Sequence, residues 1–170
     1  HAGYVYSGPI AGSAFLQLTP LKERIRRVIM AGPSHRVSFS GIAVPSTRFF
    51  ATPLGIVPVD HEAVESLRDF PYVVSMDAAH AEEHSLEVHL PFLQEVLEEF
   101  SIVPLVVGDA SPREVASVLE RLWGGPETLV AVSSDLSHYH DYDTARQMDQ
   151  ATSHAIEALR SQDIRADNAC

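Results

Sequence analysis

The sequence is short of cysteine, of basic residues and of long apolar runs, and each shortage excludes a class of protein. A single cysteine, Cys170, cannot form an internal disulfide, which favours a reducing compartment. With no signal peptide visible, we expect a cytoplasmic protein. No stretch approaches the roughly 20 apolar residues that cross a bilayer, so no membrane partner is expected. Twelve basic against 23 acidic side chains give a net charge of −11, which repels phosphate backbones and argues against a nucleic-acid partner.

Several common catalytic motifs are also missing. The sequence has no G-x-S-x-G, no P-loop and no G-x-G-x-x-G, so serine hydrolases, NTPases and dinucleotide-binding enzymes lose their usual support. The segment 80–84 spaces two histidines as the zinc-protease motif H-E-x-x-H does, but Ala81 stands where that motif has its general-base glutamate. Metal-dependent or acid–base chemistry remains.

The length of 170 residues fits one domain, which would bury roughly two thirds of its unfolded surface. We therefore expect a single domain over 1–170, with no repeat or linker. The chain has no initiator Met and ends at Cys170 without a tail-like sequence, and we expect that both ends are cut.

Alternating helical and strand patterns predict an α/β fold with helices flanking a central sheet. Apolar runs rich in β-branched residues predict buried strands at Val28–Ala31, Ile102–Val107 and Leu129–Val132. Helical patterns are found at 16–27, 83–100, 112–123 and 143–159. The third helix has the clearest start, because Ser111, Pro112 and Glu114 form a capping box with proline in the first turn. A turn signal at 52–55, within the β-rich segment 37–60, predicts a hairpin and hence a mixed sheet.

The nine histidines are the most informative residues of the sequence, and several of them occur in clusters. The first strand runs into Gly32-Pro33-Ser34-His35 and the third into 133–139, so both turns follow the carboxyl ends of strands, where α/β sheets bind ligands. The opening segment 1–9 predicts a third histidine-bearing turn ahead of a helix. A fourth cluster spans 82–92, where Pro91 either kinks the helix or begins a new one.

Each cluster also has a purely structural interpretation. His35 is interpretable as a hydrogen-bonded turn residue, Ser133 to Asp135 as a cap of the next helix, and Cys170 as a small buried apolar residue. His80, Glu83, His84 and Glu87 recur at helical spacing, which is typical of a solvated helix face.

Taken together, the motifs resemble those of the Memo family in order and spacing. They are H-A-G-Y-x-Y-S-G at 1–8, G-P-S-H at 32–35, T-P-L-G at 52–55, E-H-S-L-E-V-H-L-P-F at 83–92, S-S-D-L-S-H-Y at 133–139 and N-A-C at 168–170. The resemblance covers essentially the whole chain. It implies a three-layer sandwich with a central mixed sheet, similar to the class III extradiol dioxygenases.

The resemblance also implies a metal site. Its ligands would be His1, His35 and Cys170, with Asp135 and His138 as a second pair in the same pocket and Tyr6 as its aromatic wall. Two imidazoles and a thiolate suit one transition metal ion, with iron or copper preferred and zinc also compatible. Because the dioxygenases have a carboxylate where this pattern has a cysteine, ring cleavage is not carried over.

The leading hypothesis is an iron- or copper-dependent redox enzyme, an oxidase or dioxygenase-like protein. His138 would exchange protons with the substrate, and Asp135 would orient His138 or a bound water. A second hypothesis is a non-catalytic module that uses the same pocket for a peptide or partner, and a third is a zinc-dependent hydrolase. The ligand is accordingly a small molecule or a peptide. The oligomeric state is left open.

Overall fold

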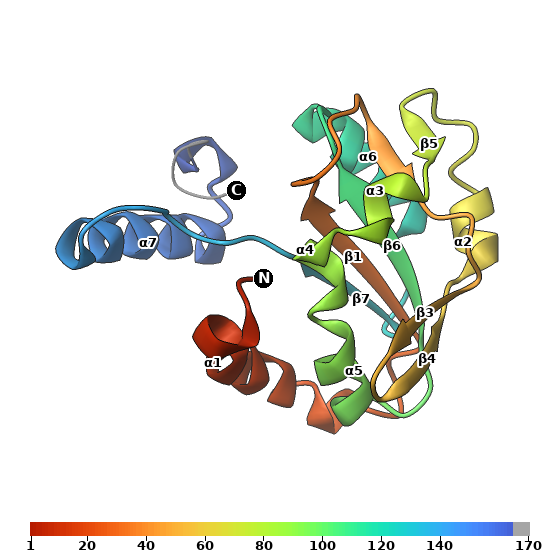
Figure 1. Ribbon diagram of the computed structural model, residues 1–170, viewed down its shortest axis with the longest axis horizontal. Helices are drawn as coiled ribbons and strands as arrows, with labels where there is room; N and C mark the ends of the chain where they lie inside the picture. The colour runs from red at the N-terminus through yellow and green to blue at the C-terminus, as the bar shows by residue number, and fades with distance from the viewer. Residues whose placement is uncertain (165–170) are drawn as a thin grey trace. The chain divides into compact units, whose positions relative to one another are not determined.

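A computed structural model describes residues 1–164 (Figure 1). The chain forms two compact units that divide after Ser133, and each is described by itself. The expectation of a single domain over the whole chain stays a prediction. Among the described residues, no helix combines the length and the apolar character that crossing a membrane requires.

The first unit is built on a mixed five-stranded sheet with the order β5-β2-β6-β1-β7. The central strand β1 pairs in parallel with both β6 and β7, whereas β2 runs antiparallel to β6 and parallel to β5. The strands are β1 (Arg27–Pro33), β2 (Ile42–Val44), β5 (Val73–Ser75), β6 (Ser101–Val107) and β7 (Thr128–Val132). The three predicted strands and the mixed sheet are confirmed, but the prediction that all three are buried is wrong for β7, which lies at the sheet edge and is only partly buried.

Helices cover both faces of this sheet. Several elements, β2 and β5 among them, lie between β1 and β6 in the chain, and the last two before β6 are α4 (His84–Glu87) and α5 (Leu90–Val96). The chain then passes from β6 across β1 to β7 through α6 (Pro112–Leu122). Figure 1 shows α4 and α5 on one face of the sheet and α6 on the other. The inner residues of β1 and β6 are therefore buried on both sides, and the predicted α/β sandwich is confirmed.

Local signals explain the smaller elements. The capping box of α6 is present, with the Ser111 hydroxyl accepting from the Glu114 backbone. The predicted hairpin consists of β3 (Phe49–Thr52) and β4 (Gly55–Pro58), paired antiparallel. Two short helices, α2 (His61–Glu65) and α3 (Ala78–Ala81), complete the layers.

Two predicted helices are wrong in extent. The pattern at 16–27 does not form a helix, because α1 spans Tyr4–Leu16 and is followed only by a 3-10 turn at Thr19–Leu21, where Pro20 disfavours helix in the residue before it. The predicted turn at 1–9 is correspondingly helical from Tyr4 onward. The helix expected at 83–100 divides into α4 and α5, because Pro91 lies in the first turn of α5, where its missing N–H costs nothing.

The second unit contains α7 (Tyr142–Glu157) and a 3-10 turn at Ser161–Asp163. Asp141 caps α7, and its carboxylate accepts from the backbone N–H groups of Asp143 and Thr144, both at 3.1 Å. The helix predicted at 143–159 is confirmed.

Candidate metal centre

The carboxyl edge of the sheet gathers three stretches of the first unit. His35 follows the end of β1, and the preceding Ser34 N–H donates to the Val107 carbonyl of β6 at 2.9 Å. Ser133 follows β7, and its N–H donates to the Ala31 carbonyl of β1 at 2.7 Å. Backbone pairing thus fixes both predicted turns at one edge of the sheet.

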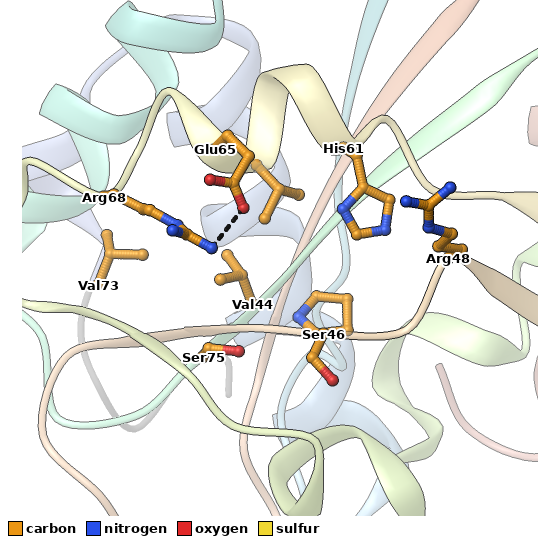
Figure 2. A pocket seen from close by; sticks show the side chains of 10 residues that line it. Val44, Ser46, Arg48, His61, Glu65, Arg68, Val73 and Ser75 are labelled. Atoms are coloured by element: carbon orange, nitrogen blue, oxygen red, sulfur yellow. Dashed lines mark ion pairs between the residues drawn. The ribbon is translucent and has the colours of Figure 1, made fainter.

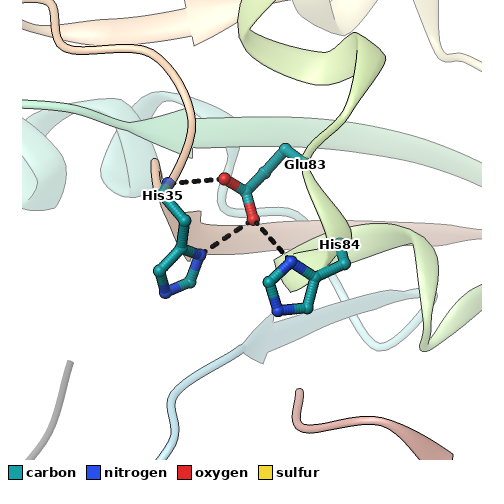
Figure 3. Close-up of side chains that lie close together, drawn as sticks. All are labelled: His35, Glu83 and His84. Atoms are coloured by element: carbon teal, nitrogen blue, oxygen red, sulfur yellow. Dashed lines mark hydrogen bonds and ion pairs between the residues drawn. The ribbon is translucent and has the colours of Figure 1, made fainter.

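The carboxylate of Glu83 holds the turn that carries His35 (Figure 3). One of its oxygens accepts from the backbone N–H of His35 at 2.5 Å, and the other lies 2.9 Å from the His35 Nδ1. The second oxygen also accepts from the Ser85 N–H at 2.9 Å and lies 3.6 Å from the His84 Nδ1. His35, Glu83 and His84 each place a ligand atom within 4.8 Å of the others, as a metal site would require.

Glu83 is a buried anion, with only 3% of its surface exposed. Burial by itself disfavours the charged form and raises the pKa of Glu83, but the hydrogen bonds from His35 and Ser85 outweigh burial and lower this pKa to about 2. Glu83 is therefore ionised at neutral pH and adds a fixed negative charge beside the imidazoles.

Three imidazole rings lie together at this edge. The ring centroids of His1 and His35 are 5.1 Å apart, those of His35 and His84 are 5.1 Å apart, and those of His1 and His84 are 5.7 Å apart. Imidazole nitrogens about 2.1 Å from a shared ion put their ring centres roughly 5 Å apart, so these spacings are compatible with a shared ion. The ligand atoms that lie within 4.8 Å of one another are those of His35, Glu83 and His84, a group to which His1 does not belong. The structure thus brings together His1 and His35, although 33 residues of other structure separate them in the sequence.

His1 is itself almost buried, with 7% of its surface exposed, and a hydroxyl holds its ring. The Ser133 Oγ lies 2.7 Å from the His1 Nδ1 and 2.9 Å from the His89 Nε2, and it donates to the Ser85 carbonyl at 2.5 Å. The turn after β7 therefore holds the His1 ring through Ser133, and the turn after β1 carries the His35 ring.

A shallow cavity of about 410 Å³ adjoins the histidine cluster. His35 and Arg36 line it from the turn after β1, and Gly108 and Asp109 line it from the end of β6. This is the crevice beyond the carboxyl ends of the strands, and its volume suits a small molecule.

Figure 2 shows a separate cavity of about 330 Å³ between β2, α2 and β5. Arg48, His61 and Arg68 line it, and Arg68 forms an ion pair with Glu65 at 2.7 Å. None of the residues singled out from the sequence lies on its wall.

The other predicted site residues belong to α1, to the second unit or to the part of the chain outside the described residues. Tyr6 lies on α1 with 83% of its surface exposed. Asp135 and His138 belong to the second unit, where the carboxylate of Asp135 lies 3.7 Å from the His138 Nε2. Cys170 lies outside the described residues, so its predicted role as a ligand stays a prediction.

Sequence reasoning missed three residues of this centre: Glu83, His84 and Ser133. The solvated helix face inferred for 80–87 is wrong, because the helix breaks between Ala81 and His84 and the Glu83 carboxylate turns inward. The capping role considered for 133–135 is also wrong, since Asp141 caps the next helix. The sequence contained one signal for Ser133, because this residue directly follows the strand β7, which pairs with β1.

Comparison with known proteins places this arrangement in a family. The family model described as "Memo-like protein" matches residues 1–168. A "MEMO1 family protein" of Thermotoga neapolitana is 40% identical over 162 residues, covering 92% of this chain and 58% of the relative. A "MEMO1 family protein" of Aquifex aeolicus is 37% identical, covering 96% of this chain and 61% of the relative. One of Nitrosopumilus maritimus is 32% identical, covering 96% of this chain and 60% of the relative. The chain thus spans about 60% of the length of these relatives. On the whole-chain match and these identities, the chain belongs to the Memo family.

Proposed function

We propose that this chain carries most of a transition-metal site and that the protein works as an oxidoreductase on a small molecule. His1 and His35 are two of the proposed ligands, Cys170 is the third, and iron or copper is the proposed ion. The observation that carries the proposal is the 5.1 Å between the rings of His1 and His35, which belong to different turns at the carboxyl edge of the sheet.

The chemistry of the donor set supports this choice. Imidazoles bind iron, copper and zinc alike, and a thiolate shifts the preference towards softer or redox-active ions. When bound, such an ion supplies Lewis acidity and, for iron or copper, electron transfer.

The chain's own residues have separate tasks in this proposal. Glu83 holds the His35 ring and adds negative charge next to the ion. The cavity beside His35 receives the substrate, and Arg36 on its wall favours a substrate that carries a negative group. His138 is proposed to exchange protons with the substrate, and Asp135, 3.7 Å away, to orient it.

Elemental analysis of the full chain tests the metal site. We expect about one iron or copper ion per wild-type chain after anaerobic purification, and a loss of most of that metal in His1→Ala, His35→Ala and Cys170→Ser, because each change removes one of three ligands. His140→Ala, which removes an exposed imidazole of the second unit, is the matched control. Unchanged metal content in His1→Ala and His35→Ala would refute the site.

A second measurement separates the oxidoreductase from the two other functions. Oxygen uptake with a chemical reductant should be present in the metal-loaded wild type and absent in His35→Ala. No uptake by a fully loaded protein that still binds a peptide or protein partner would favour a binding module instead. Bound zinc with ester or amide cleavage would favour a hydrolase.

A further inference from the structure

We infer that Ser133 and Glu83 are positioning residues that fix the tautomers of His1 and His35, so that both rings present the Nε2 nitrogen to the metal. This inference rests on the proposed metal site and deepens it. It assigns to each ligand the nitrogen that binds and the residue that selects it.

The hydrogen-bond inventory of one hydroxyl determines the tautomer of His1. A serine hydroxyl has one hydrogen to donate and two lone pairs that accept. The single hydrogen of Ser133 is directed to the Ser85 carbonyl at 2.5 Å, because a carbonyl can only accept. His1 Nδ1 at 2.7 Å and His89 Nε2 at 2.9 Å must then both donate to Ser133. A neutral His1 that donates through Nδ1 carries its lone pair on Nε2.

The carboxylate of Glu83 determines the tautomer of His35 in the same way. One of its oxygens accepts from the His35 backbone N–H, and the other accepts from the Ser85 N–H and lies 2.9 Å from the His35 Nδ1, so both oxygens act as acceptors. Nδ1 therefore carries the hydrogen and Nε2 the lone pair. Figure 3 shows the outer nitrogen of His35 on the side of the ring away from Glu83.

Ser85 joins the two arrangements into one network. Its N–H donates to Glu83 at 2.9 Å, its carbonyl accepts from Ser133, and its own hydroxyl donates to the Pro33 carbonyl of β1 at 2.9 Å. A continuous chain of hydrogen bonds thus runs from the His1 ring through Ser133, Ser85 and Glu83 to the His35 ring. Metal-binding histidines generally depend on such partners for ring orientation and basicity.

Two single substitutions separate the effects on the two proposed ligands, His1 and His35. Ser133→Ala removes the acceptor of the His1 Nδ1–H and leaves Glu83 in place. Glu83→Gln introduces an NH₂ group on one side of the amide. In one orientation the NH₂ group donates to the His35 Nδ1, and the hydrogen of the neutral ring then moves to Nε2. In the other orientation the NH₂ group faces the His35 backbone N–H, and two donors then oppose each other. The controls are Ser117→Ala and Glu82→Gln, which change exposed or peripheral side chains of the same chemistry.

The first readout is the ¹⁵N spectrum of the imidazoles in the metal-free full chain, which distinguishes the two tautomers. We expect His1 and His35 in the Nδ1–H form in the wild type. Ser133→Ala should change the signals of His1 and His89 and leave those of His35, whereas Glu83→Gln should change the His35 signals and leave those of His1. A wild type with either ring in the Nε2–H form would overturn the inference.

The second readout is affinity for Fe²⁺ and Zn²⁺, measured by chelator competition. Each substitution should weaken binding by about 10- to 100-fold, the usual loss when a hydrogen-bond partner of a metal-binding histidine is removed. Wild-type affinity in folded Ser133→Ala and Glu83→Gln would overturn the inference. If Glu83→Gln does not fold, Ser133→Ala decides. If the wild type binds no metal, the proposed function fails, and the tautomers of the metal-free protein still decide the inference.

Discussion

At the scale of single residues, the histidines of the centre differ in how firmly they are held. The Glu83 oxygen that lies 2.9 Å from the His35 Nδ1 is 3.6 Å from the His84 Nδ1, which is too long for a hydrogen bond. His84 therefore stacks beside His35, with an angle of 29° between the ring planes, and its contact with Glu83 is a longer ion pair and not the hydrogen bond that orients His35.

This difference predicts unequal effects of removing the two rings. His35→Ala should abolish metal binding, whereas His84→Ala should weaken it by no more than about tenfold, because that change removes a neighbouring ring and leaves the proposed ligands in place. Chelator competition on both variants measures the difference. Equal losses would make His84 a ligand in its own right.

The sequence predicts some residues of the centre and not others, for a physical reason. His1 and His35 were expected from motifs, and histidines after strand ends are recognisable without coordinates. Glu83 is recognisable only when the chain is folded, because its helical spacing with His80 and Glu87 resembles a solvated face. Its burial depends on a helix break and on contacts with a turn 48 residues away.

At the scale of elements, the position of α4 on β1 sets the geometry of the centre. A Cβ on Gly32 would lie 2.9 Å from the Leu86 Cδ2 and 3.0 Å from the Ser85 Oγ. Only glycine lets α4 approach the strand this closely. The same approach places Ser85 for its hydrogen bonds to Pro33, Glu83 and Ser133.

Gly32→Ala should accordingly weaken both the fold and the metal site. The added methyl must displace Ser85 and Leu86, and overpacking of this kind costs about 1 to 3 kcal/mol of unfolding free energy. The displacement also breaks the network that holds His1 and His35, so metal affinity should fall in the folded variant. Urea unfolding and chelator competition measure the two effects.

Gly12→Ala in α1 is the matched control for this substitution. Its Cβ would meet only the Phe92 ring, at an ordinary 3.7 Å, and alanine favours helix more than glycine does. Stability and metal affinity should therefore stay at or above the wild-type values. A Gly32→Ala protein that matches this control would contradict the argument from close packing.

Elements were predictable where one local signal dominates. The strands β1 and β6 are buried on both faces and appear in the sequence as continuous apolar runs, and β7, a partly buried strand at the sheet edge, has a run of the same kind. The capping box of α6 was equally clear. The helix expected at 16–27 failed because the residues of this stretch that reach the core, Leu18 and Ile25, do so from irregular backbone, an arrangement that helical periodicity alone does not distinguish.

At the scale of the whole molecule, two buried groups of the first unit make its stability depend on pH. The His80 ring packs edge-on against Phe50, and its Nε2 is buried with no hydrogen-bond partner among residues 1–164. Burial lowers the pKa of His80 from 6.5 to about 4, although the Ala43 backbone and the charges of Asp77 and Glu83 act in the opposite direction. Glu83 is the second group, with its pKa lowered from 4.5 to about 2.

Both groups stabilise the fold at neutral pH and lose that contribution in acid. Between about pH 4 and 6.5 the unfolded chain binds a proton at His80 that the folded chain does not, so stability is full above 6.5 and falls as the pH drops towards 4. The loss is at most about 3 kcal/mol for this histidine. Glu83 contributes fully above 4.5 and extends the loss as the pH falls towards 2.

Replacing His80 should therefore flatten the upper part of this profile. In His80→Gln the free energy of urea unfolding should change less between pH 6.5 and about 4 than in the wild type, because the side chain no longer titrates. The further loss below pH 4.5 should remain, since Glu83 is unchanged. Parallel profiles for the two proteins over the upper range would mean that His80 is protonated as readily in the folded chain as in the unfolded one. Burial of its ring would then contribute nothing to the acid sensitivity of the molecule.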